Sequence, residues 1–558
     1  MKTLVKATLL FFSINVFSQN TIPIPDTLVG TNISLTMHTD SMSILSGKKT
    51  KTLAYNSGFN FLGPTLIFNK WQSVNATVTN QIGDTTTLHW HGLHVASKND
   101  GGPHTQILNG ASWNPNFTIL NNASTFWYHP HFMGKTAEQA IKGASGLIII
   151  RDSAEATLAL PRKYGVDDVP LIVKCLQLDS NNQFLTQGMQ DSTLLVNGVT
   201  NPQYNLPAQV VRLRLLNASG ERAFNFGFTV SKTFYVIGND GGLLSAPVLV
   251  SRIRLAPGER AEVLLNLNGM SGQTIYLMSY ASELPIGVQG GPTMPMGSGP
   301  PMNSPLNGID FNILKLNITT QTSNPVTTIP ATLVPVTPYP QSQASLTRNI
   351  TFTADSMMVM DGPFYFNGLS FDMMRIDYKI PLNQTEIWTL MDSTMVAHPF
   401  HVHDVQFFIL DRDGNSPPPE ERGWKDVVLV QPNETVRIIM KFTDFTDSVI
   451  PYMFHCHILM HEDDGMMGQF VVMPQGWSGV TSLPRETEEI VVYPNPSINF
   501  VKIQTHSELE LITVYNSLGE TVLQTKSKNQ QEQVDVSNLP AGIYTIQAKG
   551  LHSRFIKQ

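Results

Sequence analysis

Residues 455–467 read H-C-H-I-L-M-H-E-D-D-G-M-M, so three histidines, one cysteine and three methionines fall within thirteen positions. A thiolate, imidazoles and a thioether form the soft, mixed ligand set that selects copper in a trigonal site with a weak axial methionine. Cys456, His461 and Met466 supply three of these groups. Any fold that carries such a site must bring one further histidine to this stretch from elsewhere in the chain.

The two histidines beside Cys456 cannot both join its site if the chain is extended there. Side chains alternate between the two faces of a strand, so His455 and His457 point away from Cys456. We therefore expect them to bind a different metal ion. The alternative interpretation of the whole stretch is a histidine-rich, solvated loop.

Three other motifs contain histidines in pairs: T-L-H-W-H-G-L at 87–93, F-W-Y-H-P-H at 126–131 and H-P-F-H-V-H at 398–403. The H-x-H spacing puts both imidazoles on one face of an extended segment, within reach of adjacent metal ions. His398 precedes the third pair by three residues and faces another way, which makes it the predicted second imidazole for Cys456. The histidines without a partner at this spacing are expected to be solvated or hydrogen-bonded: His38, His94, His104, His506 and His552.

Composition predicts an all-β protein of several domains. The chain has 558 residues, of which 41% are hydrophobic and 14% charged, and its 40 glycines and 36 prolines favour short strands and many turns. A net charge of -7 and the lack of a Lys/Arg-rich run argue against a nucleic-acid partner.

The N-terminal layout of the chain indicates export. Residues 1–19 have the layout of a secretory signal peptide, with Lys2 and Lys6 before an apolar run, and a buried N-terminal helix is the alternative. No other apolar run is long enough to span a bilayer, so we expect no integral membrane segment in the mature chain. Cys175 lies in the apolar run V-P-L-I-V-K-C-L-Q-L and is interpreted as a small core residue.

Strand-like segments divide the chain into predicted domains. We place a first β-domain at 20–155, a second at 160–320, a third at 345–476, a polar linker at 477–489 and a small β-sandwich at 490–558. The second domain contains no histidine, so we expect it to act as a structural spacer without metal ligands.

The four histidine motifs, their order and their spacing resemble those of the multicopper oxidases over residues 25–475. The resemblance implies three cupredoxin-like β-sandwiches and four copper ions, with a trinuclear cluster between the first and third domains. It also implies the ligands: His398, Cys456, His461 and Met466 for the type 1 copper, His89 and His401 for the type 2 copper, and His91, His129, His131, His403, His455 and His457 for the type 3 pair.

This resemblance also implies an activity. The type 1 copper accepts single electrons from a reductant, and the tripeptide His455-Cys456-His457 links it to the cluster, where four electrons reduce dioxygen to water. Asp100 and Glu462 match the family's proton-relay positions. For both carboxylates, a solvated or structural role is the alternative.

Residues 490–558 resemble a second family. The patterns Y-P-N-P-S at 493–497, V-Y-N-S-L-G-E at 514–520 and L-P-A-G-I-Y at 539–544, with the ending R-F-I-K-Q, are similar to type A sorting domains of the type IX secretion system. The implied location is outside the cell or on its surface, with the secretion machinery as a partner. A carbohydrate-binding or structural sandwich is the alternative.

The substrate is left open between two classes. Cuprous oxidases of this family tend to place an aspartate four residues before the first type 1 histidine, where this chain has Thr394, with Asp392 out of register. We therefore expect a laccase-like oxidase of phenols or other small reductants, and place oxidation of Cu(I) or other metal ions second. A non-enzymatic copper-binding surface protein is the third hypothesis. The methionines that suit Cu(I) but equally fill core gaps are Met294, Met296, Met302, Met357, Met358, Met360, Met373 and Met374.

Overall fold

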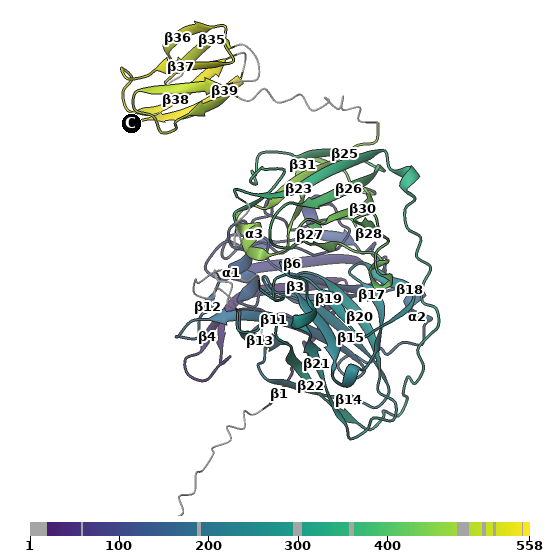
Figure 1. Cartoon of the computed structure of the whole chain (residues 1–558). Helices are drawn as coiled ribbons and strands as arrows, with labels where there is room; N and C mark the ends of the chain where they lie inside the picture. Colours follow the sequence, from purple (N-terminus) through teal and green to yellow (C-terminus); the bar gives the residue numbers. More distant parts are fainter. Residues whose placement is uncertain are drawn as a thin grey trace, which may run out of the picture. The chain divides into compact units, whose positions relative to one another are not determined.

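A computed structural model describes residues 19–56, 58, 60–186, 191–293, 304–356, 362–476, 490–504, 509–516, 520–548 and 551–558. The chain forms two compact units that divide between Gln475 and Gly476 (Figure 1). The predicted signal peptide up to residue 18, the linker 477–489, His506 and the methionines at 294, 296, 302, 357, 358 and 360 lie outside the described residues.

The first β-sandwich has alternating strands whose inward side chains form one core. In β6 the pattern S-V-N-A-T-V-T-N-Q buries every second residue, as expected for a strand with one face on a core. Two sheets, ordered β2-β5-β10-β9 and β4-β3-β6-β7, with β8 beside β6, enclose this core. The strands are β2 (Thr27–Val29), β3 (Asn32–Met42), β4 (Thr50–Tyr55), β5 (Thr65–Asn69), β6 (Ser73–Gln81), β7 (Ser112–Trp113), β8 (Asn116–Thr118), β9 (Ser124–Tyr128) and β10 (Gly146–Arg151).

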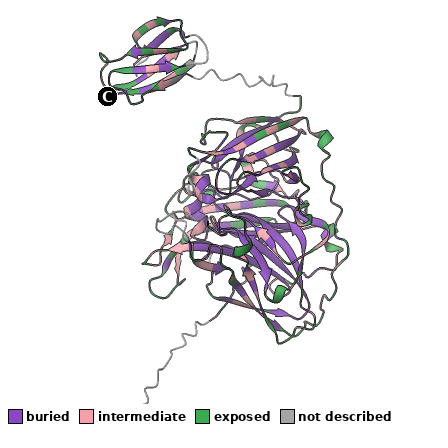
Figure 2. Ribbon diagram, viewed as in Figure 1, coloured by how far each residue is buried: buried purple, intermediate pink, exposed green. Residues whose placement is uncertain are grey.

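The second sandwich contains strands that are buried along most of their length, which Figure 2 shows as largely purple ribbons. Its sheets are ordered β1-β14-β22-β21-β16-β19 and β12-β11-β15-β20-β17-β18, with β13 beside β11. Strand β1, which lies before the first sandwich in the sequence, pairs with β14 in this sandwich. The strands are β1 (Asn20–Thr21), β11 (Asp168–Leu178), β12 (Phe184–Leu185), β13 (Thr193–Val196), β14 (Pro202–Pro207), β15 (Val210–Asn217), β16 (Phe224–Phe228), β17 (Phe234–Asn239), β18 (Gly242–Val250), β19 (Ile253–Leu255), β20 (Arg260–Asn266), β21 (Thr274–Ser279) and β22 (Phe311–Thr319).

The third sandwich places two histidine motifs on neighbouring strands. Its sheets are ordered β24-β23-β26-β30-β28 and β25-β32-β31-β27-β29. Strand β27 pairs with β31 so that Phe400 lies opposite Cys456 and His401 opposite His455. The strands are β23 (Leu346–Ala354), β24 (Phe364–Phe366), β25 (Tyr378–Pro381), β26 (Thr385–Asp392), β27 (His398–Val402), β28 (Phe407–Arg412), β29 (Val427–Val430), β30 (Thr435–Lys441), β31 (Asp447–Cys456) and β32 (Met467–Met473).

The C-terminal unit is a small sandwich with its own core of residues between Ile490 and Phe555. Its two sheets are ordered β33-β34-β37 and β36-β35-β38-β39. The strands are β33 (Val491–Tyr493), β34 (Phe500–Gln504), β35 (Glu510–Tyr515), β36 (Thr521–Ser527), β37 (Gln531–Asp535), β38 (Gly542–Ala548) and β39 (Leu551–Lys557). The prediction of an all-β protein with three larger sandwiches and a small one is confirmed.

The few helices are short, and two of them join the first and third sandwiches. The main-chain N–H groups of Thr136 and Ala137, at the start of α1, donate to the Asp463 carboxylate at the end of α3 (3.0 and 2.9 Å). This satisfies N–H groups that a helix start leaves unpaired. The helices are α1 (Thr136–Ile141), α2 (Ser153–Ala156), α3 (Leu459–Asp463) and the 3₁₀ turns η1 (Ser97–Asn99), η2 (Thr229–Ser231), η3 (Ala281–Glu283), η4 (Gln341–Gln343) and η5 (Pro419–Glu421).

Candidate metal centres

The first centre lies wholly within the third sandwich, around Cys456. The Cys456 Sγ lies 3.6 Å from Nδ1 of His398, at the start of β27, and 3.6 Å from Nδ1 of His461, on α3. Met466 is fully buried in the same core cluster, and its carbonyl accepts the Cys456 main-chain N–H at 3.1 Å. The distant histidine that the sequence predicts for Cys456 is therefore His398, and a helical turn absent from the prediction supplies His461.

The charge state of this centre suits a metal cation. Burial lowers the pKa of His461 to about 3 and the pKa of His398 well below its usual range, so both rings are neutral and keep a lone pair. Burial also raises the pKa of the Cys456 thiol well above its usual range. A cation beside the sulfur reverses that preference and favours the thiolate.

The second centre gathers eight histidines from the first and third sandwiches. The bridge between His89 and His129 joins two motifs of the first sandwich, and the β27–β31 register joins two motifs of the third. All eight side chains are fully buried. Their ring nitrogens converge in three groups within 4.8 Å: His91 with His129 and His457, His131 with His403 and His455, and His89 with His401 and His403.

His455 and His457 fall in different groups of this second centre, on either side of Cys456. Their ring centroids are 5.5 Å apart, and neither ring joins the Cys456 group. The alternation of side chains along the strand therefore has the consequence that the sequence predicts. One tripeptide spans the two centres.

In most of the eight imidazoles, the ring nitrogen that points away from its histidine group is hydrogen-bonded to an oxygen. Nδ1 of His129 donates to the Pro130 carbonyl at 2.8 Å, and Nδ1 of His89 donates to the Asp100 carbonyl at 3.0 Å. Nδ1 of His455 donates to the Cys456 carbonyl at 3.0 Å. A proton fixed on one nitrogen leaves the lone pair of the other free for a metal.

Several ring nitrogens that point into the histidine groups accept no hydrogen bond from the described part of the protein. Nε2 of His89, Nε2 of His401 and both nitrogens of His457 are buried without a hydrogen-bond partner among the described residues. Nε2 of His455 lies 3.2 Å from Nε2 of His131 and 3.3 Å from Nε2 of His403. Buried polar atoms are rarely left unpaired, and neutral imidazoles suit copper, so this donor set fits metal ions.

The two predicted proton-relay carboxylates both contact this second centre. Asp100 Oδ2 accepts from Nδ1 of His403 at 2.8 Å. The two Glu462 oxygens lie 3.2 Å from Nδ1 of His131 and 3.2 Å from Nδ1 of His455. Both carboxylates are almost fully buried, which excludes the solvated interpretation for each.

Asp426 is a third carboxylate at this centre, and the sequence analysis does not identify it. It lies between the first and third sandwiches and contacts His91 and His401. The segment G-W-K-D-V-V-L-V at 423–430 carries a signal that could have found it, because the Lys-Asp pair directly precedes a fully buried strand.

The other described histidines have ordinary surroundings. His94 contacts Asp404 and Asp444, His104 lies 2.8 Å from Gln469 Oε1, and His38 lies near Asp40. The prediction that they are hydrogen-bonded or solvated is consistent with these contacts. Cys175 is buried in the core of the second sandwich, as expected.

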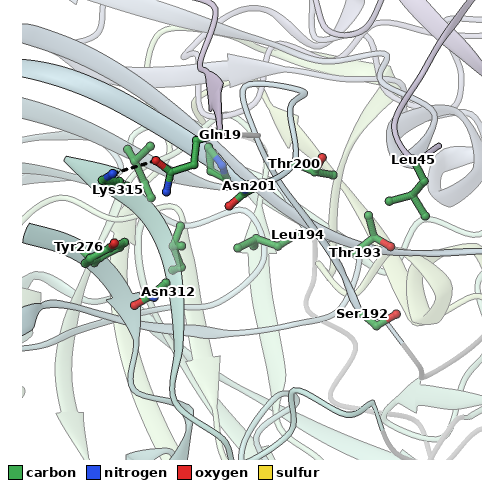
Figure 3. A pocket seen from close by; sticks show the side chains of 13 residues that line it. Gln19, Leu45, Ser192, Thr193, Leu194, Thr200, Asn201, Tyr276, Asn312 and Lys315 are labelled. Atoms are coloured by element: carbon green, nitrogen blue, oxygen red, sulfur yellow. Dashed lines mark hydrogen bonds between the residues drawn. The ribbon is translucent and has the colours of Figure 1, made fainter. Parts of the chain in front are cut away.

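A surface cleft of about 430 Å³ lies in the second sandwich (Figure 3). In it Lys315 Nζ donates to Gln19 Oε1 at 2.9 Å, and Tyr276 and Asn312 line one side. The described residues that line this cleft include no predicted metal ligand or relay carboxylate. It is separate from both centres.

Comparisons with known proteins cover most of the chain. Models of multicopper oxidase domains match residues 36–155, 172–293 and 337–476, and a secretion system C-terminal sorting domain matches residues 491–558. The chain is 33% identical over 432 residues to the multicopper oxidase mco of Staphylococcus haemolyticus, covering 76% of this chain and 84% of that protein. It is 31% identical over 463 residues to the cell division protein FtsP of Sodalis glossinidius, covering 81% of this chain and 92% of that protein.

Solved structures agree with these matches. The laccase-like multicopper oxidase CueO from a lignin-degrading Ochrobactrum, described with oxidase activity towards lignin model compounds and lignosulfonate, has a TM-score of 0.71 and 30% identity. It covers 81% of this chain and all of that one. A multicopper oxidase from Campylobacter jejuni, described as a metallo-oxidase, has a TM-score of 0.67 and 25% identity, and covers 83% of this chain and 99% of that one.

The chain belongs to the multicopper oxidase family, whose members are oxidoreductases that use dioxygen, and it ends in a type IX sorting domain. Its first three sandwiches are cupredoxin-like, as the sequence predicts. No described helix has the length and apolar character needed to cross a membrane.

Proposed function

We propose that this protein holds four copper ions in the two centres described above. The ligands of the type 1 ion are His398, Cys456, His461 and Met466. Those of the type 2 ion are His89 and His401, and those of the type 3 pair are His91, His129 and His457 for one ion and His131, His403 and His455 for the other. The three convergent histidine groups and the unpaired inward nitrogens support this assignment.

Bound copper supplies one-electron transfer at the type 1 site and the reduction of dioxygen to water at the other three ions. The protein provides the route for the electrons and the groups that transfer protons. His461 is the exposed edge of the type 1 site, because it is 5% exposed whereas the other eleven ligands are fully buried. The backbone from Cys456 to its two neighbouring histidines gives electrons a short covalent route, and Asp100 and Glu462 lie where they can pass protons to the buried cluster.

For the substrate we favour a small organic reductant of the phenolic class. The observation that carries this proposal is Thr394, whose Oγ1 lies 2.9 Å from Nε2 of His398, at the position where cuprous oxidases tend to place an aspartate. A neutral hydroxyl gives a cationic substrate no carboxylate to bind. Asp392 does not replace it, because burial raises the pKa of Asp392 to about 7 and its Oδ1 accepts the Thr394 main-chain N–H.

The relatives support both substrate classes that we weigh. Activity towards lignin model compounds in the Ochrobactrum protein favours organic reductants, and the Campylobacter metallo-oxidase favours metal ions. Of the neighbouring methionines Met373 and Met374, Met373 packs against Phe371 and Met374 is 89% exposed. Met374 is therefore the one of these two whose thioether could contact a Cu(I) ion.

Oxygen uptake by the copper-loaded protein tests the proposal. We expect a higher kcat/KM with a methoxyphenol than with Cu(I), and we expect Thr394→Asp to raise the Cu(I) value while Thr394→Ser leaves it unchanged. A higher kcat/KM for Cu(I) in the natural sequence would make the protein a cuprous oxidase. Absence of uptake with either donor would support the third hypothesis, a non-enzymatic surface protein.

We further propose that the sorting domain directs the oxidase to the cell surface or the medium. Its separate core, within residues 490–555, supports removal of this unit without loss of the oxidase fold. Deletion of residues 490–558 is expected to leave active enzyme in the periplasm. Export of the truncated protein at the natural level would contradict this role.

A further inference from the structure

Asp426 orients one histidine in each of two proposed copper sites. Its Oδ1 accepts from Nε2 of His91 at 3.2 Å, and its main-chain carbonyl accepts from Nδ1 of His401 at 2.7 Å. The two imidazoles stack, with ring centroids 3.8 Å apart and an interplanar angle of 8°. A shift of this one residue therefore moves a type 2 ligand and a type 3 ligand together.

Arg260 of the second sandwich fixes the position of Asp426. Its Nη1 and Nη2 donate to the two Asp426 carboxylate oxygens at 2.6 and 2.7 Å. Both side chains are fully buried. A paired, planar contact of this kind sets the orientation of a carboxylate as well as its distance, which a lysine cannot do.

Each of the five guanidinium N–H groups of Arg260 donates a hydrogen bond. Besides Asp426, Nε donates to the Thr125 carbonyl at 3.1 Å, Nη1 to the Gly258 carbonyl at 3.0 Å and Nη2 to the Asp240 carbonyl at 2.9 Å. A guanidinium has five N–H groups, and five acceptors surround this one. The acceptors come from all three sandwiches, because Thr125 lies in the first and Asp426 in the third.

The surrounding residues keep this arrangement rigid and close to the cluster. Lys425 Nζ lies 3.0 Å from Asp240 Oδ2 and 2.9 Å from Glu259 Oε1, which ties the residue before Asp426 to the second sandwich as well. Gly258 packs so tightly on His457 that a Cβ there would lie 2.9 Å from the ring. The turn of residues 256–260 thus forms part of the wall around the histidines.

We propose that Arg260 is a positioning residue of the trinuclear site, through which the histidine-free second sandwich holds Asp426, and with it His91 and His401, in the geometry that binds copper. The inference rests on the proposed ligand assignment. It replaces the expectation that this sandwich is only a spacer.

The test compares Arg260→Lys and Arg260→Met with a matched control, Arg212→Lys. Arg212 is another buried arginine of the second sandwich, paired with Glu155 and Glu262 and not with Asp426. Copper-loaded full-length proteins are dialysed against increasing concentrations of a copper chelator. Copper per chain, the type 2 EPR signal and the blue absorption of the type 1 site are then measured.

We expect the Arg260 variants to keep the blue absorption, which shows that the third sandwich is folded, and to lose type 2 and type 3 copper at roughly 10-fold to 100-fold lower chelator concentration, the effect usual for partners that orient metal ligands. Arg260→Lys carries the test if Arg260→Met does not fold. Arg212→Lys is expected to match the natural protein. The inference would be overturned if Arg260→Lys and Arg212→Lys retained copper equally and the type 2 signal were unchanged. A natural protein without a type 2 signal would instead overturn the ligand assignment.

Discussion

The two metal centres differ in how many sandwiches build them. Every proposed ligand of the Cys456 centre comes from residues 398–466 of the third sandwich. The eight-histidine centre takes four rings from the first sandwich and four from the third. A centre within one sandwich is placed by the pairing of that sandwich's own strands, whereas a shared centre depends on how two sandwiches dock.

Buried charge at the docking surfaces reflects this difference. Around the shared centre, Asp100, Glu462 and Asp426 contact histidine rings of the centre, and Asp463 accepts hydrogen bonds from the N–H groups at the start of α1. Around Cys456 the partners are neutral: the Thr394 hydroxyl and the Ile458 main-chain N–H, 3.4 Å from Sγ. Each of the carboxylates around the shared centre contacts a ring or a main-chain N–H of the other sandwich, so these buried contacts specify how the first and third sandwiches dock.

Removal of the Cys456 thiolate should give the largest effect, because it should abolish one centre and leave the other intact. In Cys456→Ser we expect the blue absorption at about 600 nm to vanish and oxygen uptake to fall by more than about 100-fold, beyond the loss typical of a partner outside the ligand set. The type 2 EPR signal should persist, because its proposed ligands are untouched. Loss of both signals in a folded protein would mean that the centres do not form independently.

Neutralising Glu462 should impair only the shared centre. Glu462→Gln removes a carboxylate that contacts two histidines, and we expect kcat to fall by roughly 100-fold because a general acid or base is lost. Stopped-flow reduction of the blue copper by substrate should keep its rate. Glu138→Gln, at a partly exposed carboxylate of α1 that contacts no histidine of the centre, is the control. An equal slowing of blue-copper reduction would place Glu462 in the wrong centre.

The docking of the first and third sandwiches should depend on pH through His94. Burial alone lowers the pKa of His94, but its contacts with Asp404 at 2.7 Å and Asp444 at 3.0 Å raise it to about 10. Since this pKa lies above the unfolded value of about 6.5, the stabilisation is complete below pH about 6.5 and is lost as the pH rises through about 10.

We expect His94→Ala to lower the free energy of unfolding by about 1–3 kcal/mol at pH 6, and by much less near pH 10. Urea unfolding at both values measures the difference. A deficit that stays constant with pH would show that His94 acts by packing and not by charge.

The axial ligand should give the smallest change. Met466 shares the core cluster of Cys456, whereas Met467 packs with Met453 and Phe371. Met466→Leu should raise the reduction potential of the blue copper, because loss of a weak axial donor disfavours Cu(II), with less than about 1.5 kcal/mol change in the free energy of unfolding. Met467→Leu should leave the potential unchanged. Redox titration of the blue band distinguishes them, and the opposite order would exchange the roles of the two methionines.

The sequence could predict the residues of both centres because histidine and cysteine are rare and their spacing reports which side chains share a face of a strand. It could not predict how the histidines divide into three groups, since that depends on the register of β27 with β31 and on the turn of α3. The sequence groups His461 with Cys456 without predicting the helix α3, which brings the His461 ring to 3.6 Å from the Cys456 Sγ.

The pairing of Arg260 with Asp426 could not be found from the sequence for a different reason. The two residues are 166 positions apart, and charged residues are mostly exposed, so an isolated arginine and aspartate are interpreted as surface groups. Only the docked fold shows that both are fully buried. The absence of histidine from the second sandwich was a correct observation, but it did not imply the absence of a role at the cluster.

Copper content and spectra of the loaded full-length protein test the central claim, that two centres of one oxidase share this chain. We expect about four copper ions per chain, a blue band at about 600 nm from the cysteine-ligated ion and a separate type 2 EPR signal. A folded, copper-saturated protein that binds about one ion, or that lacks the blue band, would contradict it.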